Sequence, residues 1–236
     1  MKLAIISGGS KGLGSAIAEN LHAAGYQVVE FSRSAPHAYS VKIDFSSPEQ
    51  MLPVLTSHLE KLTAQVWDEI LVVSNAASLS PIGPTAKKNS MAVLANINTN
   101  FTSAILFMSE VMKHFQSHAC RKVLVSISSG AALKAYSGWS LYCSAKAGLE
   151  SYIRTVAVEQ ASEAHPFVVL NVDPGVMDTD MQSLIRSSHK EDFPAVDYFI
   201  HRKETGELRT PEMVAAGVVK ILHSDATSGA RIPVFS

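Results

Sequence analysis

The sequence predicts one α/β domain, in which a doubly wound, mostly parallel sheet of about seven strands is flanked by helices. Short apolar runs of the length of buried strands alternate along the chain with longer segments of helical periodicity. A glycine-rich turn follows the first apolar run and leads into a helix and a second strand. This strand, turn, helix, strand order is a βαβ unit, which places its two strands in parallel. We expect a single domain over residues 1–236.

The apolar runs give the expected elements in order. The strands are expected at 3–6, 28–31, 39–43, 69–73, 122–127, 167–172 and near 230–235. Helices are expected after Gly12, after the Ser47-Pro48 cap, over 91–118, after Trp139 and over 212–222.

Composition excludes several classes of protein. Hydrophobic residues make up 47% of the chain and charged residues 17%, which favours a large core over disorder. A net charge of -1 gives no sign of a nucleic-acid partner. No apolar run reaches about 18 residues, so no membrane span is expected. The histidines lack ligand spacing, which predicts no metal. Two cysteines without a pairing pattern and the absence of a secretory leader favour the cytoplasm.

The first turn has the chemistry of a phosphate site. Its glycines are spaced Gly8-x-x-x-Gly12-x-Gly14, and a helix starts within it. Glycines let backbone amides approach a pyrophosphate, and a helix N-terminus favours negative charge. We expect a dinucleotide-binding, Rossmann-type arrangement. The expected contacts from this turn are Gly8, Ser10, Lys11, Gly12, Leu13 and Gly14.

The end of the second expected strand bears on the choice of dinucleotide. An acidic residue there suits the ribose of NAD, whereas arginine suits the 2′-phosphate of NADP. Arg33 occupies that place, and Lys11 adds a second cation from the glycine turn. Glu30 lies inside the strand and is discounted as a ribose ligand. The expected cofactor is NADPH/NADP+, although both cations could instead be solvated surface charges.

Tyr142 and Lys146 are the strongest candidates for chemistry. They lie four residues apart in a segment of helical periodicity, so both side chains point to one face. A neighbouring ammonium favours the phenolate and makes a phenol a better acid. We therefore expect Lys146 to lower the pKa of Tyr142. The alternative is a structural one, because a tyrosine and a lysine with this spacing also occur as a half-buried tyrosine on an amphipathic helix with the lysine at its edge.

These motifs together resemble the short-chain dehydrogenase/reductase superfamily, whose glycine loop begins with Thr where this chain has Ser7. The resemblance covers essentially the whole chain. It implies a catalytic set of Asn100, Ser129, Tyr142 and Lys146, in which Asn100 holds a water in a relay to the lysine. Ser129 precedes Tyr142 by thirteen residues, the family spacing. It also implies cofactor contacts at Asp44, Asn75, Ala76, Pro174, Gly175, Val176 and Thr179, besides Tyr142 and Lys146. Ala77 stands where the family has glycine.

Several local stretches narrow the resemblance. Residues 138–143 and 178–182 are similar to sepiapterin reductases. Residues 181–188, 190–193 and 206–208 are even more similar to bacterial benzil reductases that form (S)-benzoin. Pro233 falls where sepiapterin reductases carry a pterin-anchoring aspartate. The resemblance implies an NADPH-dependent reductase of a hydrophobic 1,2-diketone such as benzil. Sepiapterin or another small ketone is the alternative substrate, and a non-catalytic NADPH-binding sensor is the alternative from another class.

The segment 177–210 is long for a connection and rich in apolar residues. Such a segment is typical of a folded lid over an apolar substrate. Alternatively, the segment only packs against the rest of the domain or forms a contact between subunits. Relatives imply a homodimer or homotetramer.

Overall fold

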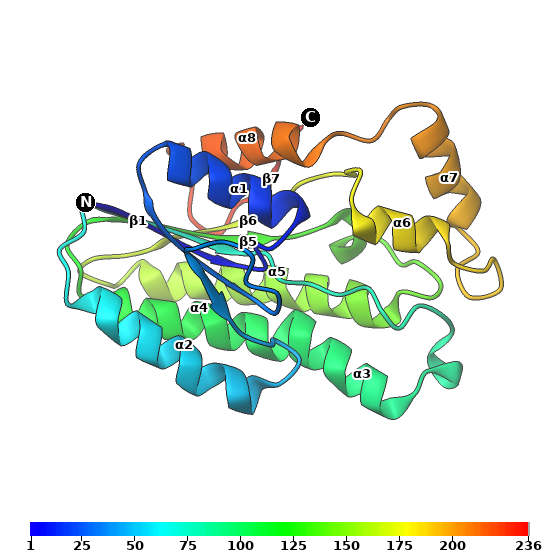
Figure 1. The fold of residues 1–236 in the computed structure, drawn as a ribbon, viewed down its shortest axis with the longest axis horizontal. Helices are drawn as coiled ribbons and strands as arrows, with labels where there is room; N and C mark the ends of the chain where they lie inside the picture. Colours follow the sequence, from blue (N-terminus) through cyan, green and yellow to red (C-terminus); the bar gives the residue numbers. More distant parts are fainter. Residues whose placement is uncertain (236) are drawn as a thin grey trace.

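The computed structural model describes residues 1–235 as one sheet between two layers of helices (Figure 1). The strands are β1 (Lys2–Ser7), β2 (Gln27–Ser32), β3 (Ser40–Lys42), β4 (Glu69–Ser74), β5 (Arg121–Ile127), β6 (Val168–Asp173) and β7 (Arg231–Pro233). Their order is β3-β2-β1-β4-β5-β6-β7, and every neighbouring pair is parallel. The predicted fold class and sheet are confirmed, with all seven strands parallel rather than most of them.

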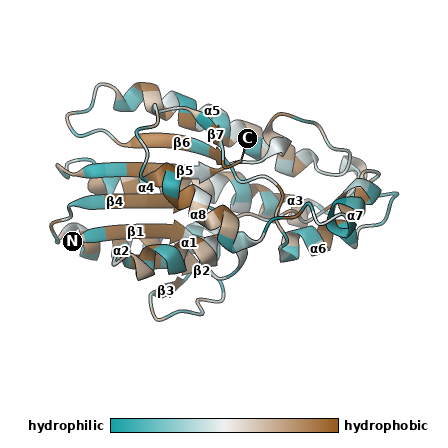
Figure 2. Ribbon diagram, turned by 90° about the horizontal axis from the view of Figure 1, so that it is seen from above, coloured by the Kyte–Doolittle hydropathy of each residue, from teal (hydrophilic) through white to brown (hydrophobic). Residues whose placement is uncertain are grey.

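The helices are α1 (Gly12–Ala23), α2 (Pro48–Thr63), α3 (Ser90–Ile97), α4 (Ser103–Phe115), α5 (Ser140–Gln160), α6 (Asp180–Arg186), α7 (Val196–Glu204) and α8 (Pro211–Leu222). In Figure 1, α1 and α8 lie on one face of the sheet, and α2, α4 and α5 lie on the other. The helices α6 and α7 lie together beyond one end of the sheet (Figures 1 and 2).

The central strands are apolar along most of their length because both faces are covered. In β1, the four residues from Leu3 to Ile6 are fully buried and point alternately to the two faces. Leu3 and Ile5 belong to the core under α2, α4 and α5. Ala4 and Ile6 belong to the core under α1 and α8. In Figure 2 the central strands are brown, the colour of hydrophobic residues, over much of their length.

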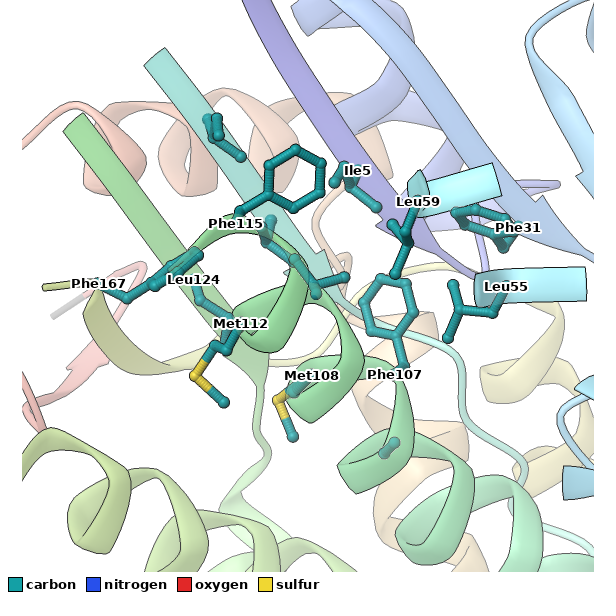
Figure 3. Close-up of a cluster of buried hydrophobic side chains, with 14 of the residues drawn as sticks. Ile5, Phe31, Leu55, Leu59, Phe107, Met108, Met112, Phe115, Leu124 and Phe167 are labelled. Carbon is teal, nitrogen blue, oxygen red and sulfur yellow. The ribbon is translucent and has the colours of Figure 1, made fainter. Parts of the chain in front are cut away.

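The larger core lies on the α2, α4 and α5 face. Figure 3 shows Phe107 and Phe115 of α4 pointing toward side chains of the strands and of α2. The rings of Phe31 and Phe107 are 6.2 Å apart in an edge-on arrangement. This contact fixes α4 against β2, so the carboxyl ends of the strands are held in a rigid frame.

The long helix expected over 91–118 is divided by a π-helical turn at Asn98–Thr102. The whole run Ser90–Phe115 is long and apolar enough to cross a membrane by length and composition, a test that core helices also pass. In this structure the apolar side of α4 faces the core, with Phe107, Val111 and Phe115 fully buried. The polar residues of the π turn interrupt the apolar run, which is why the sequence showed no continuous span.

Candidate functional site

A cavity of about 1170 Å³ lies at the carboxyl ends of the strands. The strand order reverses between β1 and β4, and ligands of open parallel sheets bind in the crevice at such a switch point. The cavity is lined by the glycine turn, the ends of β2, β4, β5 and β6, the start of α5, and α6 and α7. Nearly all the residues predicted to bind the cofactor line it. The structure thus brings these eight separate segments to one place.

The glycine turn closes tightly against the end of β4. A Cβ on Gly8 would lie 2.7 Å from the Ala76 Cα, and a Cβ on Gly14 would lie 2.1 Å from the Gly8 carbonyl oxygen. Asn75 donates its side-chain amide to that same carbonyl at 2.7 Å. Gly14 does not line the cavity but packs beneath Gly8, and its cofactor contact stays a prediction.

Ser7 replaces the usual threonine without losing the hydroxyl. Its Oγ accepts hydrogen bonds from the backbone amides of Asn75 at 3.0 Å and Ala76 at 3.3 Å. Gly12 has a left-handed φ of +57°, and the nearest atom to a Cβ there would be the Thr179 methyl at 3.5 Å. The start of α1 is therefore free of side-chain bulk where it faces the cavity. This cradle of amides at a helix N-terminus fits a dinucleotide pyrophosphate.

Glu30 belongs to the support of the turn. Its carboxylate is fully buried and accepts the Gly9 amide at 2.7 Å, together with the hydroxyls of Ser32 and Ser40. It does not line the cavity. The discounting of Glu30 as a ribose ligand therefore agrees with its position.

The two predicted phosphate cations differ in their surroundings. Arg33 is exposed at the cavity rim, near Asp44. Asp44 accepts the backbone amide of Ser46 at 2.9 Å, which holds the turn after β3. Lys11 forms an ion pair with Asp180 at 2.6 Å, linking the glycine turn to α6. Among residues 1–235, Arg33 has no ion pair, so it is the freer of the two to meet a 2′-phosphate.

Ser129, Tyr142 and Lys146 line the same end of the cavity. Ser129 caps a short 3-10 turn after β5 and accepts the Ala131 amide at 3.1 Å. Tyr142 and Lys146 lie one helical turn apart on α5, with the Lys146 Nζ 5.6 Å from the Tyr142 ring centre. The Lys146 ammonium donates to the Ile127 carbonyl at 2.6 Å. That hydrogen bond joins α5, which carries both candidate catalytic residues, to β5.

The predicted lowering of the Tyr142 pKa is wrong for the protein alone. Burial raises the pKa of Tyr142 to about 12, although hydrogen bonding to Ser129 acts in the opposite direction. Burial also lowers the pKa of Lys146 to about 8, while Glu150 acts to raise it. Both side chains are less than a tenth exposed. Loss of water around each group is therefore the dominant cause of both shifts.

Asn100 lies behind the cavity wall and does not line it. It is buried in the π-helical turn, where its Oδ1 accepts the Ser78 amide at 2.7 Å and its Nδ2 donates to the Ser78 carbonyl at 2.7 Å. Asn96, one helical turn before Asn100, lines the cavity instead. A π turn places side chains out of helical register and is frequent at functional sites. The water relay through Asn100 stays a prediction.

The segment 177–210 contains two helices rather than an open loop. Its Phe193 stacks on Trp139 with ring centres 4.5 Å apart, and Trp139 packs edge-on against Tyr142 at 6.2 Å. The segment also contributes Met181, Ile185, Tyr198 and Phe199 to the cavity wall. An aromatic surface thus lies beside the candidate catalytic tyrosine.

Gly138 allows this contact. A Cβ there would lie 2.3 Å from the Asp192 carbonyl oxygen, and its φ of +90° is left-handed. The segment 177–210 can therefore lie directly on the loop before α5 only because residue 138 is glycine.

Comparison with known proteins agrees with this geometry. The family model for short chain dehydrogenases matches residues 2–190. The chain belongs to the short-chain dehydrogenase family. It is 35% identical over 234 residues to a benzil reductase ((S)-benzoin forming) of Bacillus subtilis, covering 97% of this chain and 96% of the relative. It is 29% identical over 213 residues to the sepiapterin reductase of Mus musculus, covering 79% and 78%. The crystal structure of the enzyme KRED1-Pglu superposes with a TM-score of 0.83 at 25% identity, covering 98% of this chain and all of that chain.

The family resemblance did not indicate every residue at the site. Glu150, Asp173 and Arg231 form a charged cluster next to the candidate catalytic residues, in which Glu150 is buried and the other two are half-buried. Glu150 is four residues beyond Lys146, so its helical spacing could have revealed it. Arg231 lies 81 residues from Glu150 in the chain, and no local pattern connects the two.

Proposed function

We propose that this protein is an NADPH-dependent carbonyl reductase whose substrate is a hydrophobic ketone, with 1,2-diketones such as benzil as the preferred class. Its family is one of oxidoreductases that interconvert carbonyl and alcohol groups. The observation that carries the proposal is the convergence of Ser129, Tyr142 and Lys146 on one cavity that is also lined by the glycine turn and Arg33.

The residues support specific roles. Backbone amides of the turn from Gly8 to Leu13 would hold the pyrophosphate, and Arg33 would hold the 2′-phosphate. The loop from Pro174 to Thr179 lines the cavity beside Gly12 and would hold the nicotinamide. When bound, the cofactor supplies the hydride that reduces the carbonyl carbon.

The chain supplies the proton and the stabilisation of the oxygen. The Tyr142 hydroxyl donates its proton to the carbonyl oxygen, and the Ser129 hydroxyl donates a hydrogen bond to the same atom. Lys146 contributes a positive charge next to the phenol, which eases loss of the proton. The cavity wall of Trp139, Tyr142 and Phe199 excludes water and offers flat apolar surfaces to aromatic rings.

The substrate class rests on two lines of support. The wall beside Tyr142 is aromatic, and benzil reductases are similar over nearly the whole chain. Sepiapterin is the second candidate because sepiapterin reductase is similar over most of the chain. Pro233, where a pterin-anchoring aspartate would fall, lies in β7 and favours the diketone.

A substrate panel tests the proposal. Purified protein is assayed for NADPH oxidation with benzil, aliphatic 1,2-diketones, sepiapterin and simple ketones side by side. We expect the highest kcat/KM for aromatic diketones and the alcohol product by chromatography. If activity is highest on sepiapterin, the proposed diketone substrate is wrong and sepiapterin takes its place. Tight NADPH binding with no turnover on any member would favour the non-catalytic sensor.

We further propose segment 177–210 as the substrate lid, the cytoplasm as the compartment and a homodimer or homotetramer as the assembly. Met91, Leu94 and Ile97 of α3 are exposed apolar residues consistent with an oligomer contact. Light scattering of the purified protein gives its mass in solution.

A further inference from the structure

A buried carboxylate lies one helical turn beyond Lys146. Glu150 of α5 is 4% exposed, as is Lys146, and the two residues share a face of the helix. Glu150 does not line the cavity, so it has no contact with a bound substrate. A buried carboxylate is costly unless it is paired and hydrogen-bonded, so its retention here calls for partners.

Glu150 is held by two partners from other parts of the fold. Arg231 of β7 donates its Nε to the Glu150 Oε1 at 2.7 Å, and the Ser128 hydroxyl donates to the same oxygen. Ser128 is the residue immediately before Ser129. The carboxylate therefore joins the catalytic-candidate helix directly to the loop that carries Ser129.

Arg231 extends this cluster to β6. Its guanidinium donates to the Asp173 Oδ2 at 2.7 Å and approaches the Ser129 carbonyl at 3.5 Å. Asp173 in turn accepts the Gly175 amide at 3.0 Å, at the start of the loop expected to hold the nicotinamide. One arginine thus connects α5, the Ser129 loop and the end of β6.

The charges of this cluster act on the two titrating groups of the site. Glu150 raises the pKa of Lys146, in opposition to burial, and Asp173 raises the pKa of Tyr142. Arg231 faces both carboxylates and partly cancels them. Tyr142 and Glu150 lie one helical turn to either side of Lys146 on α5, and the Lys146 ammonium donates to the Ile127 carbonyl of β5. Arg231 of β7 faces Glu150 and Asp173 of β6.

We propose that Glu150, which is hydrogen-bonded to Arg231 and Ser128, is a positioning residue. It keeps Lys146 charged and holds the Ser129 loop in place beside Tyr142. This inference rests on the proposed reduction at Ser129, Tyr142 and Lys146. The inference predicts the direction in which each variant shifts the pKa of Lys146. Loss of the Glu150 charge makes Lys146 easier to deprotonate, whereas loss of the Arg231 charge makes it harder.

The test measures Lys146 directly and needs no substrate. The ¹³Cε resonance of Lys146 in lysine-labelled protein is assigned by its absence in Lys146→Met and followed against pH. We expect Glu150→Gln to lower the Lys146 pKa, and Arg231→Gln to raise it, each by about half a unit or more. Glu150→Asp restores the charge and should move the value back toward wild type. If Arg231→Gln does not fold, the comparison of Glu150→Gln with Glu150→Asp decides.

Arg154→Gln is the matched control. Arg154 also faces Glu150 from α5, at 3.9 Å, but its side chain is 58% exposed and screened by water. It should shift the Lys146 titration much less than Arg231→Gln. A Lys146 pKa that is unchanged in Glu150→Gln, or that moves in the same direction in Glu150→Gln and Arg231→Gln, would overturn the inference.

Activity gives an independent readout. In reductase assays, Glu150→Gln should move the alkaline limb of the kcat profile to lower pH, and Arg231→Gln should move it to higher pH. A merely structural role would lower kcat or thermal stability without moving the limb in opposite directions. If wild-type protein reduces no ketone, the proposed function fails, and the titration of Lys146 still decides the role of Glu150.

Discussion

Tyr142 and Lys146 face one cavity from adjacent turns of α5, and burial moves their pKa values in opposite directions, to about 12 and about 8. Each shift favours the neutral form of its group. A neutral phenol is the form that donates a proton. The lysine, in contrast, is useful as an ammonium, so its charge depends on the groups around it.

Replacement of Tyr142 by phenylalanine removes the proposed proton donor and keeps the ring against Trp139. We expect kcat to fall by about 10² or more, because a positioned general acid contributes about that factor. NADPH affinity, measured by fluorescence titration, should stay close to wild type. A variant with near wild-type kcat would remove Tyr142 from the chemistry.

Replacement of Lys146 by methionine should abolish most activity and stabilise the fold at pH 7. The folded pKa of about 8 lies below the ordinary lysine pKa of 10.5, so burying the ammonium costs about 3 kcal/mol where both states are protonated. Between about pH 8 and pH 10.5 the unfolded chain binds more protons than the folded protein, so the free energy of unfolding of the wild type rises with pH. Loss of the Ile127 bond offsets part of the gain.

The measurement is urea unfolding of wild type and Lys146→Met at pH 7 and pH 10. We expect the free-energy advantage of the variant at pH 7 to shrink toward pH 10. An advantage that does not change between the two pH values would show that Lys146 is not desolvated as the structure implies.

Replacement of Arg33 by aspartate should weaken NADPH binding by about 10-fold or more and affect NADH much less, since the arginine meets only the 2′-phosphate. Lys11→Gln is the comparison, because Lys11 is already paired with Asp180 and should contribute less. Dissociation constants for both cofactors give the answer. Equal losses for NADPH and NADH in Arg33→Asp would place the 2′-phosphate elsewhere.

Replacement of Gly138 by alanine should raise KM for diketones several-fold while leaving NADPH affinity intact. The new Cβ would lie 2.3 Å from the Asp192 carbonyl oxygen, which displaces the segment that carries Phe193. Gly206→Ala is the matched control, because Gly206 also has a positive φ of +72° but nothing within 4 Å of its Cβ position.

Both alanines carry the same backbone strain of about 1 kcal/mol or more, so the control isolates the clash at Asp192. Steady-state kinetics and thermal melting of the two variants are compared. Equal KM values in both would show that the position of segment 177–210 does not influence substrate binding.

The sequence by itself determined the features that depend on local patterns. Apolar runs and glycine spacing predicted the parallel sheet and the turn from Gly8 to Gly14, because strand and helix periodicities are properties of neighbouring residues. The spacing of Tyr142 and Lys146 placed both on one face of α5 for the same reason. The assignment of Ser129 came from family spacing, because both Ser128 and Ser129 line the cavity.

Only the tertiary structure decided the sign of the Tyr142 pKa shift, the packing role of Gly14 and the placement of Asn100 behind the wall. It also decided that Arg231 meets Glu150 from 81 residues away and that Asp192 lies on Gly138. Desolvation and long-range ion pairs depend on what surrounds a group in space. No local pattern in the chain records those neighbours, so folding alone brings them together.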